Sequence, residues 1–319
     1  MATPAEAVSS WAAPARPPGT LVELLARFPG DEACRRYLAQ VRWPGGFACP
    51  ACSGRQCWWL SDGRLSCSSC RKRISLTAAT IFADTKLPLQ TWFQAAWLVT
   101  NTKNGMSALS LQRALGLRSY ESSWLLLHKL RRAMVRLGRE PLSGEVEVDE
   151  SYLGGPTAGA RGRGTGKAIV AIAAQSRPEG KIGRIRLALV PDISQQSLHD
   201  FCLDAIAPGS VVCTDGLPSY RGLEALGYEH QPTAITGTGS PAHVVMPRVH
   251  RVASLLKRWL LGTHQGGMQE RQLSFYLDEF VFRFNRRSSR SRGHLFLRLL
   301  EQTLQTNPVT GDRIVGGHS

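Results

Sequence analysis

The spacing of apolar residues changes near residue 144 and divides the chain into a helical first half and a second half that opens with strands. In the first half, apolar residues recur every three or four positions, as on the buried face of an amphipathic helix. Pro29 and Gly30 interrupt this pattern, so residues 20–46 are expected to form a helical hairpin. Helices are expected again throughout 87–140.

After residue 144 the apolar residues alternate with a period of two, which is typical of half-buried strands. Three such stretches predict an antiparallel meander, with a Gly- and Arg-rich loop at 154–167 between the first two strands. A helix, a short apolar strand and another helix follow. The order β-β-β-α-β-α predicts an α/β fold with a mixed sheet over 144–300. The expected elements are strands at 145–152, 168–175, 182–190 and 210–214, and helices at 195–206, 218–226, 249–261 and 269–286. Residues 301–319 show no periodicity and are expected to form a tail.

The net charge of the chain indicates which kinds of molecule it is expected to bind. Its 319 residues include 39 Lys and Arg against 24 Asp and Glu, which gives a net charge of +15 and a pI near 10.0. Such a surface attracts polyanions, nucleic acid first among them, while an anionic membrane or no anionic partner are the alternatives. No apolar run approaches the roughly 18 residues of a membrane-spanning helix. Residues 1–19, rich in Ala and Pro, are expected to be disordered and lack the pattern of a secretory signal, so we expect a cytoplasmic, nucleoid-associated protein.

Four of the eight cysteines form two Cys-x-x-Cys pairs within the compact segment 47–80. Pairs separated by 14 residues can close two turns on one tetrahedral ion, and four thiolates favour structural zinc over buried free cysteines. A closed four-thiolate site leaves no position for water, so this metal is expected to stabilise a small fold. The expected zinc ligands are Cys49, Cys52, Cys67 and Cys70. No ligand role is expected for Cys34, Cys57, Cys202 and Cys213.

A helix-turn-helix is expected within 107–137. A short helix ends at Gly116, and a longer one begins at Ser119, a residue type favoured at helix N-caps. Between residues 118 and 139 there are six Lys or Arg and one acid, so contact with DNA phosphates is expected along the second helix. The alternative is a helical linker with a solvated basic face. The expected DNA-binding residues here are Lys129, Arg131, Arg132 and Arg136.

Two aspartates are candidates for a metal-dependent catalytic site. Asp149 lies within the first expected strand, where Glu147 shares its face of the sheet and Glu150 points to the other face. Asp215 follows the short apolar strand, at the C-terminal end where ligands gather. If these two strands are neighbours, the two carboxylates meet and can hold Mg²⁺ for phosphoryl transfer. Either aspartate alone would be read as a turn or capping residue.

Several further stretches are distinctive in combination. They are Phe28-Pro29 with Tyr37-Leu38 and Arg42-Trp43-Pro44, Val148-Asp149-Glu150-Ser151-Tyr152-Leu153-Gly154-Gly155, Thr214-Asp215-Gly216, His250-Arg251-Val252-Ala253-Ser254-Leu255-Leu256-Lys257, Leu261-Gly262-Thr263-His264, Tyr276-Leu277-Asp278-Glu279-Phe280 and Phe282-Arg283-Phe284-Asn285-Arg286-Arg287. Together with the two cysteine pairs, these stretches resemble the DDE-type transposases of bacterial insertion sequences, which carry a zinc ribbon ahead of an RNase H-like (ISXO-like) catalytic domain. The resemblance spans residues 20–300.

The resemblance implies that both aspartates bind catalytic Mg²⁺ or Mn²⁺ and that a third metal-site residue precedes a Lys by seven positions. Lys257 matches that Lys, and His250 stands where the family usually has Glu or Asn. Imidazole is a poor ligand for Mg²⁺ and a better one for Mn²⁺, so His250 either binds metal, orients water, contacts phosphate or has a structural role only. Asp278 or Glu279 is the alternative third ligand.

As partner, the resemblance implies double-stranded DNA, both the element ends and the target, bound by a homo-oligomer. The implied reaction nicks an element end and joins the freed 3′ hydroxyl to target DNA. Lys257, Arg251 and Arg258 are expected to contact phosphate, in a segment from 248 to 298 with 11 Lys or Arg and three acids. Two alternatives stay open: a non-catalytic zinc-ribbon and helix-turn-helix DNA-binding protein, and a stand-alone nuclease on the same core.

Overall fold

The computed structural model describes all residues except 1–15, 137, 155–166, 234–244, 265–267 and 317–319. Most of the expected disordered start and of the expected Gly- and Arg-rich loop lies outside the described residues. The chain forms two compact units, which we call the N-terminal unit (Met1–Leu137 with Ser289–Ile314) and the sheet unit (Gly138–Ser288 with Val315–Ser319). None of the helices in the described part of the chain combines the length and apolar character needed to span a membrane.

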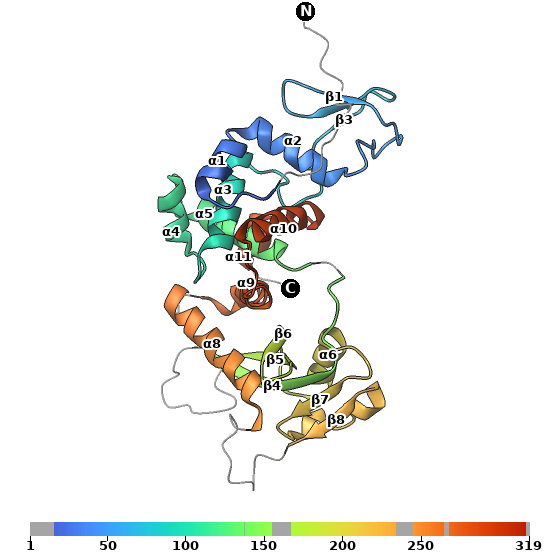
Figure 1. The fold of residues 1–319 in the computed structure, drawn as a ribbon, viewed down its shortest axis with the longest axis vertical. Helices are drawn as coiled ribbons and strands as arrows, with labels where there is room; N and C mark the ends of the chain where they lie inside the picture. The colour runs from blue at the N-terminus through green and yellow to red at the C-terminus, as the bar shows by residue number, and fades with distance from the viewer. Residues whose placement is uncertain (1–15, 137, 155–166, 234–244, 265–267, 317–319) are drawn as a thin grey trace, which may run out of the picture. The chain divides into compact units, whose positions relative to one another are not determined.

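Helices form most of the N-terminal unit: α1 (Leu21–Arg27), α2 (Asp31–Arg42), α3 (Leu89–Asn101), α4 (Ala108–Leu115), α5 (Tyr120–Ala133) and α10 (Arg292–Gln305) (Figure 1). An aromatic cluster joins them. The ring centroid of Phe28, the residue after α1, lies 5.4 Å from that of Tyr37 on α2 and 4.8 Å from that of Phe93 on α3. The ring of Phe296 on α10 lies 5.9 Å from Phe93 and 5.6 Å from Trp97. These edge-on contacts make one core from helices at both ends of the chain.

The position of α10 differs from the sequence prediction, which placed residues up to 300 in the catalytic domain and a tail after them. Ser291 caps α10, and its apolar side packs against α2, α3 and α5. A further helix, α11 (Gly311–Gly316), follows within the expected tail. Contacts between segments far apart in the chain decide where such a helix packs, and the local pattern of apolar residues does not contain that information.

A three-stranded antiparallel sheet forms the ribbon: β1 (Cys57–Trp59), β2 (Leu65–Cys67) and β3 (Arg73–Ile74). Its apolar core is small and contains three cysteines (Cys49, Cys57 and Cys67) with the buried side chains of Phe47, Leu65 and Ile74. A core of this size does not stabilise a fold alone, so the ribbon depends on an additional crosslink.

The sheet unit is built on a five-stranded mixed sheet with the order β6-β5-β4-β7-β8. Its strands are β4 (Glu145–Leu153), β5 (Ala168–Ser176), β6 (Ile182–Val190), β7 (Val211–Thr214) and β8 (Glu229–Pro232). The first three strands pair antiparallel, which confirms the predicted meander, and β7 and β8 add to β4 in parallel. This strand order is that of the RNase H-like fold, with β4 at the centre.

Two details depart from the predicted order. The stretch 218–226 forms two short 3₁₀ turns, η1 (Pro218–Tyr220) and η2 (Leu223–Leu226), instead of an α-helix. Gly222 between them has φ of 88°, in the left-handed region, which interrupts a right-handed helix. The edge strand β8 was not predicted, because Glu229–Pro232 contains no alternating apolar residues.

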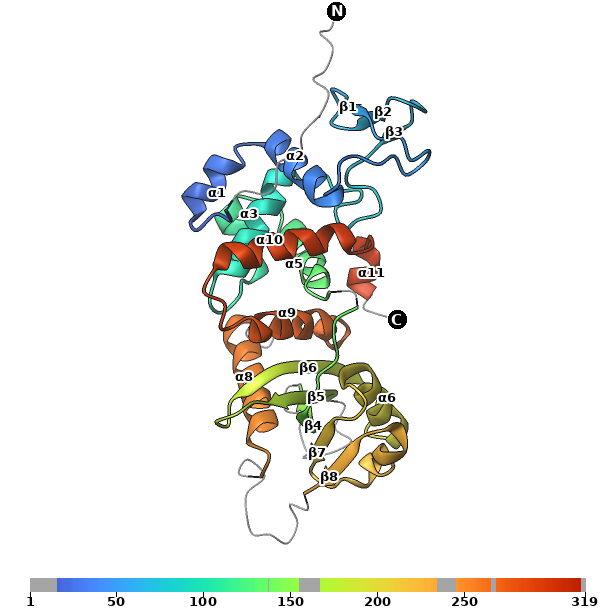
Figure 2. The same cartoon turned by 45° about the vertical axis from the view of Figure 1, so that its right-hand side comes forward.

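Each face of the sheet carries its own apolar core (Figures 1 and 2). On one face, α8 (Pro247–His264) and α9 (Leu273–Asn285), the latter preceded by η3 (Glu270–Gln272), pack on side chains such as Val170, Ile172 and Leu187. On the other, α6 (Gln195–Ala205) and η1 pack on Val146 and Val148. Because side chains alternate along a strand, Glu145, Glu147 and Asp149 of β4 face α8.

We expect Phe296→Ala to destabilise the N-terminal unit by roughly 3–5 kcal/mol, since a fully buried aromatic side chain leaves a cavity between α10 and α3. Urea unfolding followed by tryptophan fluorescence measures this loss. The matched control on the same helix is Arg298→Ala, whose side chain is 55% exposed and whose loss is expected to cost under about 0.5 kcal/mol. Equal losses in the two variants would contradict the packing of α10 in this core.

Candidate functional site

The four cysteines of the two Cys-x-x-Cys pairs come together at one end of the ribbon. The Sγ atoms of Cys49 and Cys70 are 3.7 Å apart, those of Cys52 and Cys67 are 3.6 Å apart, and all four ligand atoms lie within 4.8 Å of one another. Amide hydrogen bonds, first from Cys70 and then from Ser69, lower the pKa of Cys67 to about 6, which favours the metal-binding thiolate. The donor set and its compactness fit one tetrahedral zinc ion.

The backbone turns in the same way after each cysteine pair. Ser53 follows the first pair with φ of 59° and Arg71 follows the second with φ of 60°. The amide of each of these residues donates to the carbonyl of the first cysteine of its pair. The other cysteines lie elsewhere, and burial raises the pKa of their thiols: to about 12 for Cys34 and Cys202 and to about 11 for Cys57 and Cys213. None of these four thiols belongs to the group of ligand atoms that lie within 4.8 Å of one another.

The predicted pair of helices with a Gly turn is present as α4 and α5. Gly116 ends α4 with φ of 62°, and the hydroxyl groups of Ser107 and Ser119 cap the two helices, each accepting an amide hydrogen bond of 3.1 Å. The second helix ends at Ala133, four residues before the predicted end. The sequence therefore predicted the turn and both N-termini correctly.

The basic residues of α5 that were expected to contact DNA are less exposed to solvent than the sequence predicted. Arg131 is 2% exposed, and its guanidinium lies 3.3 Å from Nε2 of His128. Lys129 and Arg132 are half-buried, and Arg136 is exposed beyond the end of the helix. The prediction that Arg131 contacts phosphate is therefore wrong, because α5 packs against α3 and α10 and Arg131 lies on its buried side. At the opposite end of α5, Arg118, Tyr120 and Glu121 are exposed.

The two candidate aspartates lie on adjacent parallel strands. Val146 of β4 pairs with Val212 of β7, and Glu147 with Cys213. Extending this register by two residues puts Asp215, the residue after β7, opposite Asp149. Burial raises the pKa of the Asp149 carboxyl group, and the nearby charge of Asp215 raises it further. Two carboxylates that meet in this way, one of them half-buried, form a candidate site for a cation.

Helix α8 adds the other two predicted residues to this place. Nδ1 of His250 lies 3.7 Å from Oδ2 of Asp149, and both His250 and Lys257 oppose the rise in the pKa of Asp149. The structure therefore gathers Asp149, Asp215, His250 and Lys257 on the face of the sheet that α8 covers. Within the described chain, only the four ribbon cysteines bring three or more ligand atoms within 4.8 Å of one another.

The alternative third ligands lie on a different part of the unit. Helix α9, which carries Asp278 and Glu279, packs against β6, two strands from β4 (Figure 2). Glu279 is fully buried and accepts a hydrogen bond of 2.7 Å from Nε of Arg283. This carboxylate is thus neutralised within its own helix, and the structure favours His250 as the third residue near the aspartates.

Sequence reasoning missed two sets of residues that support the site. Thr214 and His230 share a hydrogen bond of 2.9 Å, and the Thr214 hydroxyl also accepts the amide of Gly216, 3.4 Å away, which fixes the turn around Asp215. His230 lies on β8, the strand that the sequence did not reveal. On the opposite face, the Tyr220 hydroxyl bonds to the carboxylate of Glu150, as its predicted orientation allows.

The second set is a buried ion pair between Glu147 and Arg248, with 2.7 Å between the carboxylate and the guanidinium. The sequence placed Glu147 on the face of Asp149 but gave it no partner. One signal could have found it: Met246 precedes α8 and Pro247 is its first residue, and neither can cap a helix through its side chain.

Comparisons with known proteins identify both parts of the chain. Residues 29–73 match the transposase zinc-ribbon domain, and residues 141–285 match the ISXO2-like transposase domain, which together span more than half of the chain. An uncharacterized protein in transposable element ISH50 of Halobacterium salinarum is 26% identical over 289 residues, 80% of this chain and 91% of that protein. The catalytic core domain of BIV integrase is similar over 49% of this chain and 94% of its own, at 15% identity and a TM-score of 0.31. The chain belongs to the family of insertion-sequence transposases that carry a zinc ribbon and an ISXO2-like transposase domain.

Proposed function

We propose that the protein cleaves DNA at the ends of an insertion sequence and joins the freed 3′ hydroxyl to target DNA. The observation that carries this proposal is the meeting of Asp149 and Asp215 on adjacent parallel strands, with His250 and Lys257 of α8 beside them. Two carboxylates on one sheet face, flanked by an imidazole and a lysine ammonium group, suit the transfer of a phosphoryl group between oxygen atoms. The half-buried position of Asp149 strengthens its interaction with a bound cation.

The carboxylates of Asp149 and Asp215 would hold Mg²⁺ or Mn²⁺, which supplies Lewis acidity and a more acidic bound water when present. His250 offers a nitrogen donor, which suits Mn²⁺ better than Mg²⁺. Its Nδ1 faces Asp149, so this imidazole either completes the ligand set or orients the attacking water.

Helix α8 also offers a path for the DNA backbone. Arg251, Lys257 and Arg258 are exposed on it, while Val252 and Leu256 are buried against the sheet. The exposed cations can bind phosphates next to the reacting bond and neutralise charge there.

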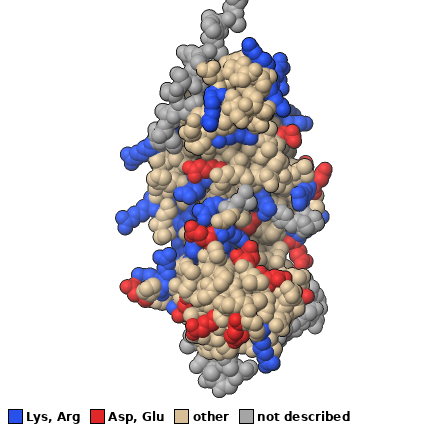
Figure 3. Space-filling view, turned by 90° about the vertical axis from the view of Figure 1, so that its right-hand side faces the viewer, with Lys and Arg blue, Asp and Glu red and all other residues tan. Residues whose placement is uncertain are grey.

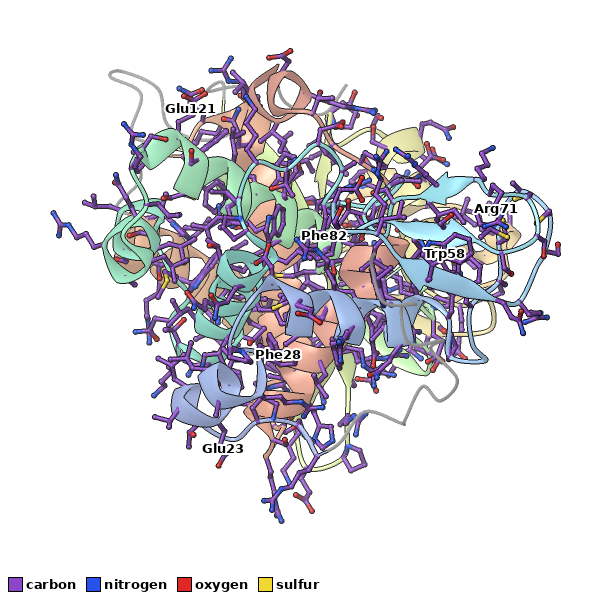
Figure 4. The ribbon with its side chains drawn as sticks, turned by 90° about the horizontal axis from the view of Figure 1, so that it is seen from above. Glu23, Phe28, Trp58, Arg71, Phe82 and Glu121 are labelled. Atoms are coloured by element: carbon purple, nitrogen blue, oxygen red, sulfur yellow. The ribbon has the colours of Figure 1, made fainter. Side chains whose placement is uncertain are left out.

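The zinc ribbon and the first turn of α5 are proposed to bind element ends. In helix-turn-helix proteins, the N-terminal residues of the second helix contact base edges, and here Tyr120 is 53% exposed at that position. Figure 3 shows Lys and Arg side chains gathered at the upper end of that view, where the ribbon lies. Arg71 there stacks over Trp58, with 5.1 Å from its guanidinium carbon to the ring centroid (Figure 4). The exposed ribbon cations are Arg55, Arg64, Arg71, Lys72 and Arg73.

We predict that Asp149→Asn and Asp215→Asn each lower DNA cleavage by roughly 100- to 1,000-fold or more, because the amide keeps the shape but loses the charge that holds a divalent cation. Single-turnover cleavage and strand-transfer assays on DNA bearing the element's ends, with Mg²⁺ and separately with Mn²⁺, measure the effect. Circular dichroism and DNA affinity should stay close to those of the unchanged protein.

The same assays separate the alternatives. A protein that binds the ends but cuts no DNA with either metal would be a non-catalytic DNA-binding protein. Cleavage without strand joining would indicate a stand-alone nuclease. Wild-type rates in both Asp variants would show that this site is not the catalytic one.

For the ribbon, we predict one zinc ion per chain and its loss in Cys67→Ser, since three thiolates no longer close a tetrahedral site. Metal analysis of the purified protein measures the content, and proteolysis within residues 47–80 measures the accompanying unfolding. Cys57→Ser is the control, because Cys57 is buried outside the set of four. Equal zinc content in the two variants would refute the assignment.

At the helix-turn-helix, we predict that Tyr120→Ala reduces the preference for element ends over unrelated DNA by about 1–3 kcal/mol, as expected for loss of a base contact. Binding measured at several salt concentrations separates this from a general loss of phosphate contacts. Val22→Ala is the control, since Val22 is 76% exposed on α1, outside the motif. An unchanged end preference in Tyr120→Ala would move recognition to another surface.

A further inference from the structure

One carboxylate joins the central strand of the sheet to the start of α8. Glu147 lies in β4, two residues before Asp149, and its side chain is only 3% exposed. Its Oε2 accepts the backbone amides of Arg248 and Val249, at 2.7 and 2.8 Å, and its Oε1 accepts the guanidinium of Arg248 at 2.7 Å. All of these groups belong to the sheet unit.

The start of α8 needs such a partner. The first amides of a helix have no acceptor within the helix, and a side chain just before it usually supplies one. Met246 stands at that position and has no oxygen, while Pro247, the first helical residue, has no amide to satisfy. The two amides that follow are bonded by Glu147, so a carboxylate from β4 replaces the missing cap and adds a negative charge at the positive end of the helix.

Further contacts between β4 and α8 occur at matching positions along the two elements. Arg248 also reaches Glu145, with 3.4 Å between Nη1 and Oε1. Two residues further on each element, His250 faces Asp149. Glu147, which fixes the first turn of α8, is therefore the direct neighbour of Asp149 on the same face of β4.

We propose that Glu147 is a positioning residue: by capping α8 and pairing with Arg248 it sets where His250 and Lys257 stand relative to Asp149. It contacts no reacting group itself. The expected effect of Glu147 on the cleavage rate rests on the proposed function. Its expected effect on the position of α8 rests on the hydrogen bonds alone.

The sharpest change is Glu147→Gln. The single amide oxygen can still accept the two backbone amides, but the side-chain NH₂ then faces the guanidinium of Arg248, so donor meets donor. We expect the single-turnover cleavage rate to fall roughly 100-fold, since a displacement of about 1 Å at a reacting centre has that effect. DNA affinity should change less than about twofold, because the phosphate-binding side chains remain.

The double variant Glu147→Gln with Arg248→Met removes the opposed donors and keeps an acceptor for the two amides. We expect the double variant to cleave at least about tenfold faster than Glu147→Gln alone, because the effects of two residues in contact are not additive. A merely structural effect, in which each change only lowers stability, predicts that the double variant is slower than either single variant.

Asn285→Ala provides a matched control. Asn285 on α9 bonds the backbone of Ile185 on β6 through both ends of its amide, at 2.7 and 3.0 Å, so it also joins a helix to a strand of the sheet. We expect this variant to lose a comparable amount of thermal stability and to cleave within about threefold of wild type at a temperature where all variants are folded.

Hydrogen exchange of the full-length protein tests the structural part without any cleavage. Glu147→Gln should speed amide exchange in the first two turns of α8 and leave α9 unchanged, and Asn285→Ala should do the reverse. Unchanged exchange in α8 would overturn the inference, as would a cleavage rate equal to that of Asn285→Ala. If the wild-type protein cuts no DNA, the proposed function fails, while the exchange pattern still decides whether Glu147 holds α8.

Discussion

The parallel pairing of β4 with β7 is the constraint on which the sheet unit depends. The β-meander brings β4 to the centre of the sheet, and a crossover through α6 returns the chain beside it in the same direction. Because the strands are parallel and their register is fixed by buried Val146 and Val212, Asp149 in the middle of β4 lies opposite Asp215, the residue after β7. A shift by one residue would turn Asp149 toward the opposite face. The positions of the two carboxylates thus follow from backbone hydrogen bonds and from the core beneath them.

Acidic side chains on a half-buried sheet face carry a cost in free energy, which the neighbouring helix reduces. Glu145, Glu147 and Asp149 alternate along β4, and burial already raises the pKa of Asp149. Arg248 pairs with the first two, and His250 and Lys257 lie near the third. The amphipathic character of α8 therefore has two consequences: its apolar residues cover the sheet, and its cationic residues balance the carboxylates.

The sequence predicted what depends on local pattern and missed what depends on tertiary contacts. The cysteine spacing, the Ser caps of α4 and α5 and the alternation in β4 are local, and each agrees with the structure. The burial of Arg131 could not be predicted, because a basic residue on a helix looks the same whether that side faces solvent or other helices. The cap of α8 by Glu147 joins residues about 100 positions apart, and no sequence period reports such a contact.

Within the same group of charges, a histidine in place of a third carboxylate has a physical rationale. The α8 face of the sheet already holds Glu145, Glu147, Asp149 and Asp215, and Arg248 forms ion pairs with the first two. Another carboxylate at position 250 would face Asp149 across 3.7 Å and raise its pKa further, whereas the imidazole lowers it. If the proposed site holds a divalent cation, the same exchange would weaken its preference for Mg²⁺, which binds oxygen ligands, relative to Mn²⁺, which accepts nitrogen. The residue at position 250 therefore decides whether the charge facing Asp149 raises or lowers the pKa of that carboxyl group.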